Sequence, residues 1–167
     1  MHVQELYVQL GRLEADMSRD RTQMTVERMA RESVGYQLRM LNRVVTGIYE
    51  DELRPLKLKV SQLTILAVTA KQGQVRAVEL CRTLQMDAST VSRNVERMRA
   101  RGWLEQAPGE DSRSHPFRLT ASGRKVLRDA TLAWEQAQAT AVGLLGKEGV
   151  ALLRRTTSNV KARISAE

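Results

Sequence analysis

Apolar positions recur every three or four residues over most of the chain. One such stripe covers residues 3–17, and a second covers residues 34–53. This spacing places apolar side chains on one face of an α-helix. The polar stretch 18–25 between the two stripes predicts a break. Pro55 predicts the end of the second helix, because proline disfavours helical geometry at the residue before it.

Three shorter helices are expected next. Ser61 is placed to cap the first of them, since a serine hydroxyl accepts an unpaired N–H of the first helical turn, and Gly73 is placed to end it. The second covers residues 75–84. Asp87 is expected to cap the third, which runs until Gly102.

The pattern then changes from helical spacing to short strands. Residues 103–107 and 116–119 predict two strands around a turn, 108–112, that contains proline, glycine and aspartate. Thr120 is expected to cap a long helix, which Gly146 interrupts before a last helix. The sequence therefore predicts a mainly α, α+β winged helix: about six to seven helices with a two-stranded β-hairpin wing.

The third short helix has the composition of an element that reads DNA. Small hydroxyl side chains near a helix N-terminus fit the major groove, and an arginine can fork onto guanine or grip a phosphate. We expect bases to be read by Ser89, Thr90, Ser92 and Arg93, and phosphates to be held by Arg97 and Arg76. The alternative is a capped surface helix whose arginines are only solvated.

The net charge of +8 favours a polyanionic partner, although a soluble protein with an arginine-rich surface has the same charge. Cys81 is the only cysteine, which excludes an intrachain disulfide and a cysteine-based zinc cluster. The sequence contains no glycine-rich phosphate loop, HExxH or GxSxG motif. We therefore expect neither an enzyme nor a cofactor or metal.

The chain has no run of about 20 apolar residues, and residues 1–14 carry acids that a signal peptide would lack. These features predict a soluble cytoplasmic protein with no membrane partner.

An ordered set of short motifs resembles the MarR (multiple-antibiotic-resistance regulator) family of winged-helix proteins. The motifs that carry the resemblance are Leu53-Arg54-Pro55-Leu56, Ser61-Gln62-Leu63-Thr64-Ile65-Leu66, Glu79-Leu80, Met86-Asp87-Ala88-Ser89-Thr90-Val91-Ser92-Arg93, Arg101-Gly102-Trp103-Leu104, Gly109-Glu110-Asp111-Ser112-Arg113 and Leu119-Thr120-Ala121-Ser122-Gly123. They follow the family's order and approximate spacing from about residue 30 onward.

The resemblance implies an obligate homodimer that binds a pseudo-palindromic operator in double-stranded DNA. It also implies that Arg113, braced by Asp111, enters the minor groove, whose negative potential attracts arginine. The wing is about three residues shorter than the family's common form, with Ser114, His115 and Pro116 where further charges often stand. Residues 1–25 extend beyond the family's usual start.

The resemblance and the two-faced helices predict the domain organisation. Residues 1–25 would form an extension helix associated with the dimer, 26–57 and 121–167 a helical dimerisation region drawn from both termini, and 58–120 the winged helix-turn-helix. The alternative is packing within one chain only. The side chains expected to fill an intersubunit core are Val126, Leu127, Ala130, Trp134, Ala137 and Leu145, extended by Leu152, Leu153, Val160 and Ile164.

The family often releases DNA when a small aromatic or phenolic acid binds between the dimerisation helices and the DNA-binding lobe. Residues expected to line such a pocket here are Tyr36, Met40, Arg43 and Trp134, although plain core packing is the alternative. Cys81 is expected to be a small buried residue rather than a redox switch. The resulting hypothesis is a homodimeric repressor. The alternatives are a winged-helix protein–protein adaptor and an architectural DNA binder without ligand control.

Overall fold

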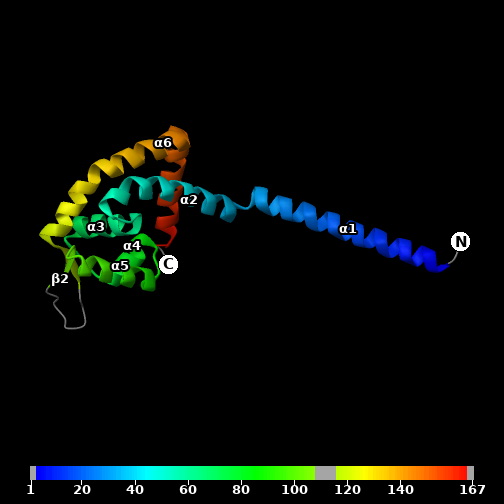
Figure 1. The fold of residues 1–167 in the computed structure, drawn as a ribbon, viewed down its shortest axis with the longest axis horizontal. Coiled ribbons are helices and arrows are strands. Elements are labelled where there is room, and N and C mark those ends of the chain that lie inside the picture. The colour runs from blue at the N-terminus through cyan, green and yellow to red at the C-terminus, as the bar shows by residue number, and fades with distance from the viewer. Residues whose placement is uncertain (1–2, 108–115, 165–167) are drawn as a thin grey trace. The chain divides into compact units, whose positions relative to one another are not determined.

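The computed structural model describes residues 3–107 and 116–164, and the chain divides into two compact units (Figure 1). The first unit contains residues 1–44 and the second contains residues 45–167. Within the described ranges, no helix combines the length and the apolar character that a membrane span requires.

The first unit contains helix α1 (Val3–Glu32), drawn in blue in Figure 1, and the start of helix α2 (Val34–Leu53). The break predicted at residues 18–25 is wrong, because α1 continues through it. That segment is polar but contains neither glycine nor proline. The hydroxyls of Thr22 and Thr25 donate to backbone oxygens four residues earlier, at 2.9 and 2.8 Å, a pattern that a helix accommodates.

The interruption lies at Ser33 instead. Its hydroxyl oxygen accepts the backbone N–H of Tyr36 at 3.2 Å, which satisfies a donor in the first turn of α2. The predicted end of α2 is confirmed, since Leu53 is its last residue and Pro55 lies in the short 3₁₀ helix η1 (Arg54–Leu56) that follows.

The second unit contains the end of α2 and a winged helix. Its further elements are α3 (Val60–Gln72), β1 (Gln74–Val75), α4 (Ala77–Leu84), α5 (Ala88–Ala100), β2 (Leu104–Gln106), β3 (Phe117–Leu119) and α6 (Ala121–Ile164). This order confirms the predicted mainly α winged helix, with six α-helices in the described ranges. The sheet has three strands in the order β1-β3-β2, not two. Only Val75 of the extra strand, β1, was included in the predicted helix 75–84, and the strand was not predicted because two residues show no alternation.

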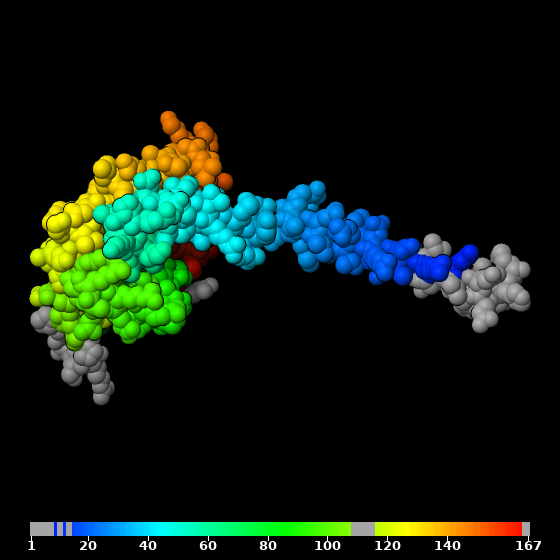
Figure 2. Space-filling model, viewed as in Figure 1, coloured from blue at the N-terminus to red at the C-terminus, as the bar shows by residue number. Residues whose placement is uncertain are grey.

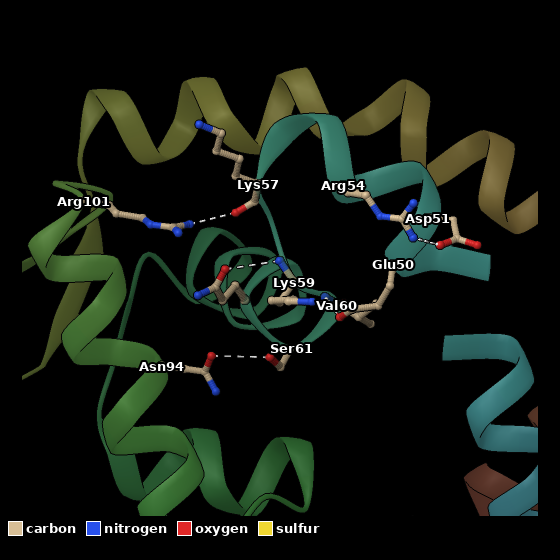
Figure 3. Close-up of polar contacts among 10 residues, drawn as sticks. Glu50, Asp51, Arg54, Lys57, Lys59, Val60, Ser61, Asn94 and Arg101 are labelled. Atoms are coloured by element: carbon tan, nitrogen blue, oxygen red, sulfur yellow. Dashed lines mark hydrogen bonds and ion pairs between the residues drawn. The ribbon is translucent and has the colours of Figure 1, made fainter. Parts of the chain in front are cut away.

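The predicted cap of α3 at Ser61 is wrong, because α3 begins at Val60 and its N-cap is Lys59. The N–H of Val60 donates to a carboxylate oxygen of Glu50, at 3.2 Å, and the N–H of Lys59 donates to the side-chain oxygen of Gln62, also at 3.2 Å (Figure 3). The Glu50 carboxylate also pairs with the Lys59 ammonium group. The start of α3 is therefore held by a residue of α2, ten positions away in sequence.

The start of α6 confirms the predicted cap at Thr120. The hydroxyl oxygen of Thr120 accepts the N–H of Gly123 at 2.9 Å and donates to the carbonyl of Gly102 at 2.6 Å. A Cβ atom at Gly123 would lie only 2.1 Å from the carbonyl oxygen of Trp103, so only glycine fits here. The break predicted at Gly146 is also confirmed, as its φ of 70° kinks α6.

One hydrophobic core joins α3, α4, α5, the sheet and the first part of α6. Its fully buried members include Leu53, Leu58, Ile65, Leu66, Val75, Leu80, Val91 and Met98. Ala130 and Ala137 are buried in the single chain, at 1% and 0% exposure, so the prediction that they form an intersubunit core is corrected. Val126 and Leu127 pack against the same core, because the first turns of α6 lie on α3.

Candidate nucleic-acid interface

Helix α5 buries one face in the core and leaves the opposite face open. Val91, Val95 and Met98 are at most 4% exposed and form the buried stripe. At about 100° per residue, Ser89, Arg93 and Arg97 fall on the opposite side. These polar residues are exposed. The green atoms of α4 and α5 lie at the surface of the second unit in Figure 2.

The N-terminus of α5 is capped by Asp87, as predicted. A carboxylate oxygen of Asp87 accepts the N–H of Thr90 at 2.7 Å and the hydroxyl of Ser89 at 2.6 Å. The Ser89 hydroxyl, then Thr90, hold the pKa of the Asp87 carboxyl well below its ordinary value, because each donates to the charged form. The cap remains ionised at neutral pH and fixes the first turn of α5.

The next turn carries the polar groups expected to meet DNA. Arg93 donates to the hydroxyl oxygen of Thr90 at 3.3 Å, and Ser92 donates to Glu96 at 3.4 Å. Among the described residues, neither Arg93 nor Arg97 has a carboxylate within ion-pair distance. Their charges are therefore available to an anionic ligand, while Glu96 is the one acid on this face.

Helix α5 is fixed to α3 by a polar contact that the sequence pattern did not predict. Asn94 is only 9% exposed, donates to the carbonyl of Thr90 at 2.9 Å, and has its side-chain oxygen 3.4 Å from the Ser61 hydroxyl (Figure 3). Asn94 occupies the i+3 position of the apolar stripe that starts at Val91. A polar residue at an inward-facing position is the feature of the sequence that could have indicated this contact.

The far end of α5 is also anchored. Arg101 donates to the carbonyl of Lys57 at 2.8 Å (Figure 3). Its guanidinium also lies 4.8 Å from the ring centre of Trp103. This arginine holds the loop before α3.

Arg76, expected to hold a phosphate, is the N-cap residue of α4 and already has an anionic partner. Its guanidinium donates to Glu79 at 3.0 Å, and its backbone N–H donates to the same carboxylate at 2.7 Å. These contacts, the backbone hydrogen bond first, lower the pKa of Glu79. A DNA phosphate would have to compete with Glu79 for this side chain.

The wing is described only at its base. Strands β2 and β3 pair antiparallel, with Glu105 opposite Arg118 and a 2.7 Å ion pair between them. Asp111 and Arg113 lie outside the described residues, so their expected role in the minor groove stays a prediction.

The second unit contains a cavity of about 370 Å³. Its lining consists of Tyr49, Val60, Leu63, Thr64, Ala67, Leu127, Ala130, Thr131 and Trp134. Trp134 was expected in a ligand pocket. Tyr36, Met40 and Arg43 belong to the first unit and are exposed, and their role in ligand binding stays a prediction. Cys81 is partly buried against the core, not fully buried as expected.

One polar contact of a lining residue of this cavity, Tyr49, was not predicted from the sequence. The hydroxyl of Tyr49 donates to the side-chain oxygen of Gln138, which links α2 to α6 beside the cavity. Burial raises the pKa of Tyr49, so its hydroxyl stays protonated at neutral pH. No local pattern connects two residues 89 positions apart.

Comparisons with known proteins agree with this geometry. Residues 56–114 match the sequence model of the MarR family. The chain is 28% identical over 90 residues to YwoH, an uncharacterised helix-turn-helix transcriptional regulator of Bacillus subtilis. That match covers 54% of this chain and 66% of YwoH, slightly under two thirds of the relative.

Two solved structures resemble the fold. One is the transcriptional regulator MOSR of M. tuberculosis in complex with DNA: 29% identity, 80% of this chain and 96% of that chain covered, TM-score 0.68. The other is BpsR of Bordetella bronchiseptica, whose DNA binding is regulated by 6-hydroxynicotinic acid: 27% identity, 75% and 94% covered, TM-score 0.68. The proteins named in these comparisons are regulators, not enzymes.

Proposed function

We propose that the chain is a member of the MarR family of winged-helix proteins and a sequence-specific DNA-binding transcription regulator. The observation that carries the proposal is the open face of α5. Two arginines without a described ion-pair partner lie there: Arg93 beside small hydroxyls in the N-terminal half of α5, and Arg97 in its last turn. The Ser61–Asn94 contact joins the same helix to α3. MOSR, with a similar fold, was solved on DNA.

Specific roles follow from the positions of the side chains. Ser89, Thr90, Ser92 and Arg93 lie on the first two turns of α5, which is where major-groove helices contact base edges. Arg97 lies one turn later and suits a phosphate, and Arg76 could add a second phosphate contact if it leaves Glu79. Arg113 would enter the minor groove.

The regulator acts as a homodimer in this proposal. Residues 26–57 and 121–167 supply the dimerisation helices, and residues 58–120 supply the DNA-binding part. Exposed apolar side chains on the two helical regions support it, among them Leu38, Leu144, Leu152 and Ile164. A twofold axis would set two copies of α5 about one DNA turn apart, roughly 34 Å, which fits a pseudo-palindromic operator. In this proposal the regulator represses transcription.

A small ligand that releases DNA is the finer part of the proposal. The nine residues that line the 370 Å³ cavity include Tyr49 and Trp134 but no charged side chain. A neutral aromatic or phenolic molecule suits that lining better than a carboxylate does, because a buried anion needs a cationic partner. BpsR responds to an acid, so the two proteins would differ in this respect.

The ligand proposal can be checked with a matched pair of compounds. Phenol, titrated into the protein–DNA complex, should release DNA at a lower concentration than benzoate does. Substituting the lining residue Ala67→Phe should weaken that response and leave DNA affinity unchanged. Equal release of DNA by the two compounds, or no release from the wild-type protein, would exclude neutral phenolic molecules as the ligand class.

The function itself is tested by selection from random duplex DNA. Retained molecules are sequenced at about 150 mM salt, where non-specific attraction is screened. An inverted repeat with half-sites about one helical turn apart supports the proposal. Retention without a motif would favour the architectural binder. No retention by a folded dimer would favour a protein–protein adaptor instead.

A further inference from the structure

Every side chain of helix α1 whose exposure is described is exposed in the single chain. Gln9, Arg12 and every residue from Ala15 to Glu32 are exposed, including Met17 at 57% and Met24 at 58%. The helix has 30 residues, which makes it roughly 45 Å long. Helices in proteins gain most of their stability from packing an apolar face, so we expect α1 to pack against a partner.

The sequence of α1 has the seven-residue repeat of a coiled coil. The repeat covers residues 3–24 and ends there, because the next d and a positions of α1 are the charged residues Glu27 and Arg31. Its positions a and d are Val3, Leu6, Leu10, Leu13, Met17, Asp20 and Met24. Six of these seven are apolar, and Asp20 is the exception. A repeat of 3.5 residues per turn keeps one narrow stripe facing a second helix. The width of the stripe indicates a helix, rather than a globular surface, as its partner.

The flanking charges favour a second copy of the same helix. Asp16 lies at a g position and Arg21 at the following e position. In a parallel pair in register, the g residue of one helix lies beside the next e residue of its partner. Twofold symmetry then forms the Asp16–Arg21 attraction twice. In the in-register pair the two Asp20 side chains face each other, which weakens the core at that layer. A shifted alignment that placed Asp20 against leucine would be disfavoured, because it would bury the charge in an apolar layer.

We propose that α1 pairs with α1 of a second copy as a parallel two-stranded coiled coil. This inference rests on the proposed homodimeric function and deepens it, because it adds a second contact between the subunits outside the winged helix. The pairing enlarges the interface between the two subunits.

The test is disulfide cross-linking of the full-length chain in a Cys81→Ser background. Met17→Cys places the thiol at an a position, and Met29→Cys places it at an f position on the same exposed helix. A disulfide requires Cα atoms within about 7 Å, a separation that facing a positions satisfy and outer f positions do not. Under a mild oxidant, Met17→Cys should cross-link roughly tenfold faster or more, because pairing raises its effective concentration.

Equal cross-linking of the two variants, or none in either, would overturn the proposal. A second comparison covers the core layer: Asp20→Leu should raise the melting temperature of the helical signal, whereas Met17→Lys should lower it and Met29→Lys should not. No difference among these three would also overturn it. DNA selection by the same samples separates this outcome from a failure of the proposed function, since cross-linking is measured without DNA.

Discussion

Helices α5 and α1 are both rich in arginine, yet they are positioned by different means. Helix α5 buries Val91, Val95 and Met98 in the core of its own chain. Helix α1 is exposed wherever its side chains are described. Helix α5 presents a rigid polar face because its apolar face is already buried in its own chain. Helix α1 has an apolar stripe that its own chain does not bury, so its stability depends on a partner.

The largest expected effect is on core packing. Leu66→Ala removes a fully buried side chain and should lower the free energy of unfolding by about 2–5 kcal/mol. Met24→Ala is the control in α1. Urea unfolding can be followed by tryptophan fluorescence, because Trp103 and Trp134 both lie in the second unit. Equal losses from the two substitutions would contradict the contrast between the packed core of the second unit and the exposed helix α1.

The junction between the wing and α6 should show the next largest effect. Gly123→Ala places a methyl group against the Trp103 carbonyl, and overpacking of this kind costs about 1–3 kcal/mol. Gly143→Ala is the matched control within α6, because its added methyl would meet nothing within 4 Å. This control should be neutral or stabilising by up to about 1 kcal/mol. Thermal melts of both variants measure the difference.

A smaller effect is expected from the cap of α5. The folded state holds the Asp87 pKa below its unfolded value, so the carboxylate stabilises the fold above the unfolded value, about 3.9. That stabilisation is lost as pH falls through the folded pKa. Asp87→Asn keeps a cap acceptor but removes the charge, so the dependence of unfolding free energy on pH below about 4 should become shallower. An unchanged dependence would mean that Asp87 is not held ionised by its hydrogen bonds.

The accuracy of the sequence-based predictions depended on the range of the interactions involved. Asp87, Thr120 and Gly146 were placed correctly, because a cap or a left-handed glycine acts within one turn. The cap expected at Ser61 was wrong because Glu50, in another helix, supplies the acceptor. The predicted break at 18–25 was wrong because polar residues without glycine or proline remain helical.

The candidate site shows the same division. The exposed face of α5 follows from helical periodicity alone, so Ser89, Arg93 and Arg97 could be identified from the sequence. The contact of Asn94 with Ser61 and the pairing of β1 with β3 both join positions more than 30 residues apart. Such contacts are decided by tertiary packing, which no local pattern contains.

The most direct test of the central claim, that α5 reads base sequence, is the affinity of Arg93→Ala for a selected operator and for an altered half-site. The account predicts a loss of about 1–3 kcal/mol on the operator and little loss on the altered site, so specificity relaxes. Arg97→Ala is the matched control and should weaken binding to both sites similarly, with the salt slope reduced by about one unit. An equal loss on both sites for Arg93→Ala would make Arg93 a phosphate contact and would contradict the claim.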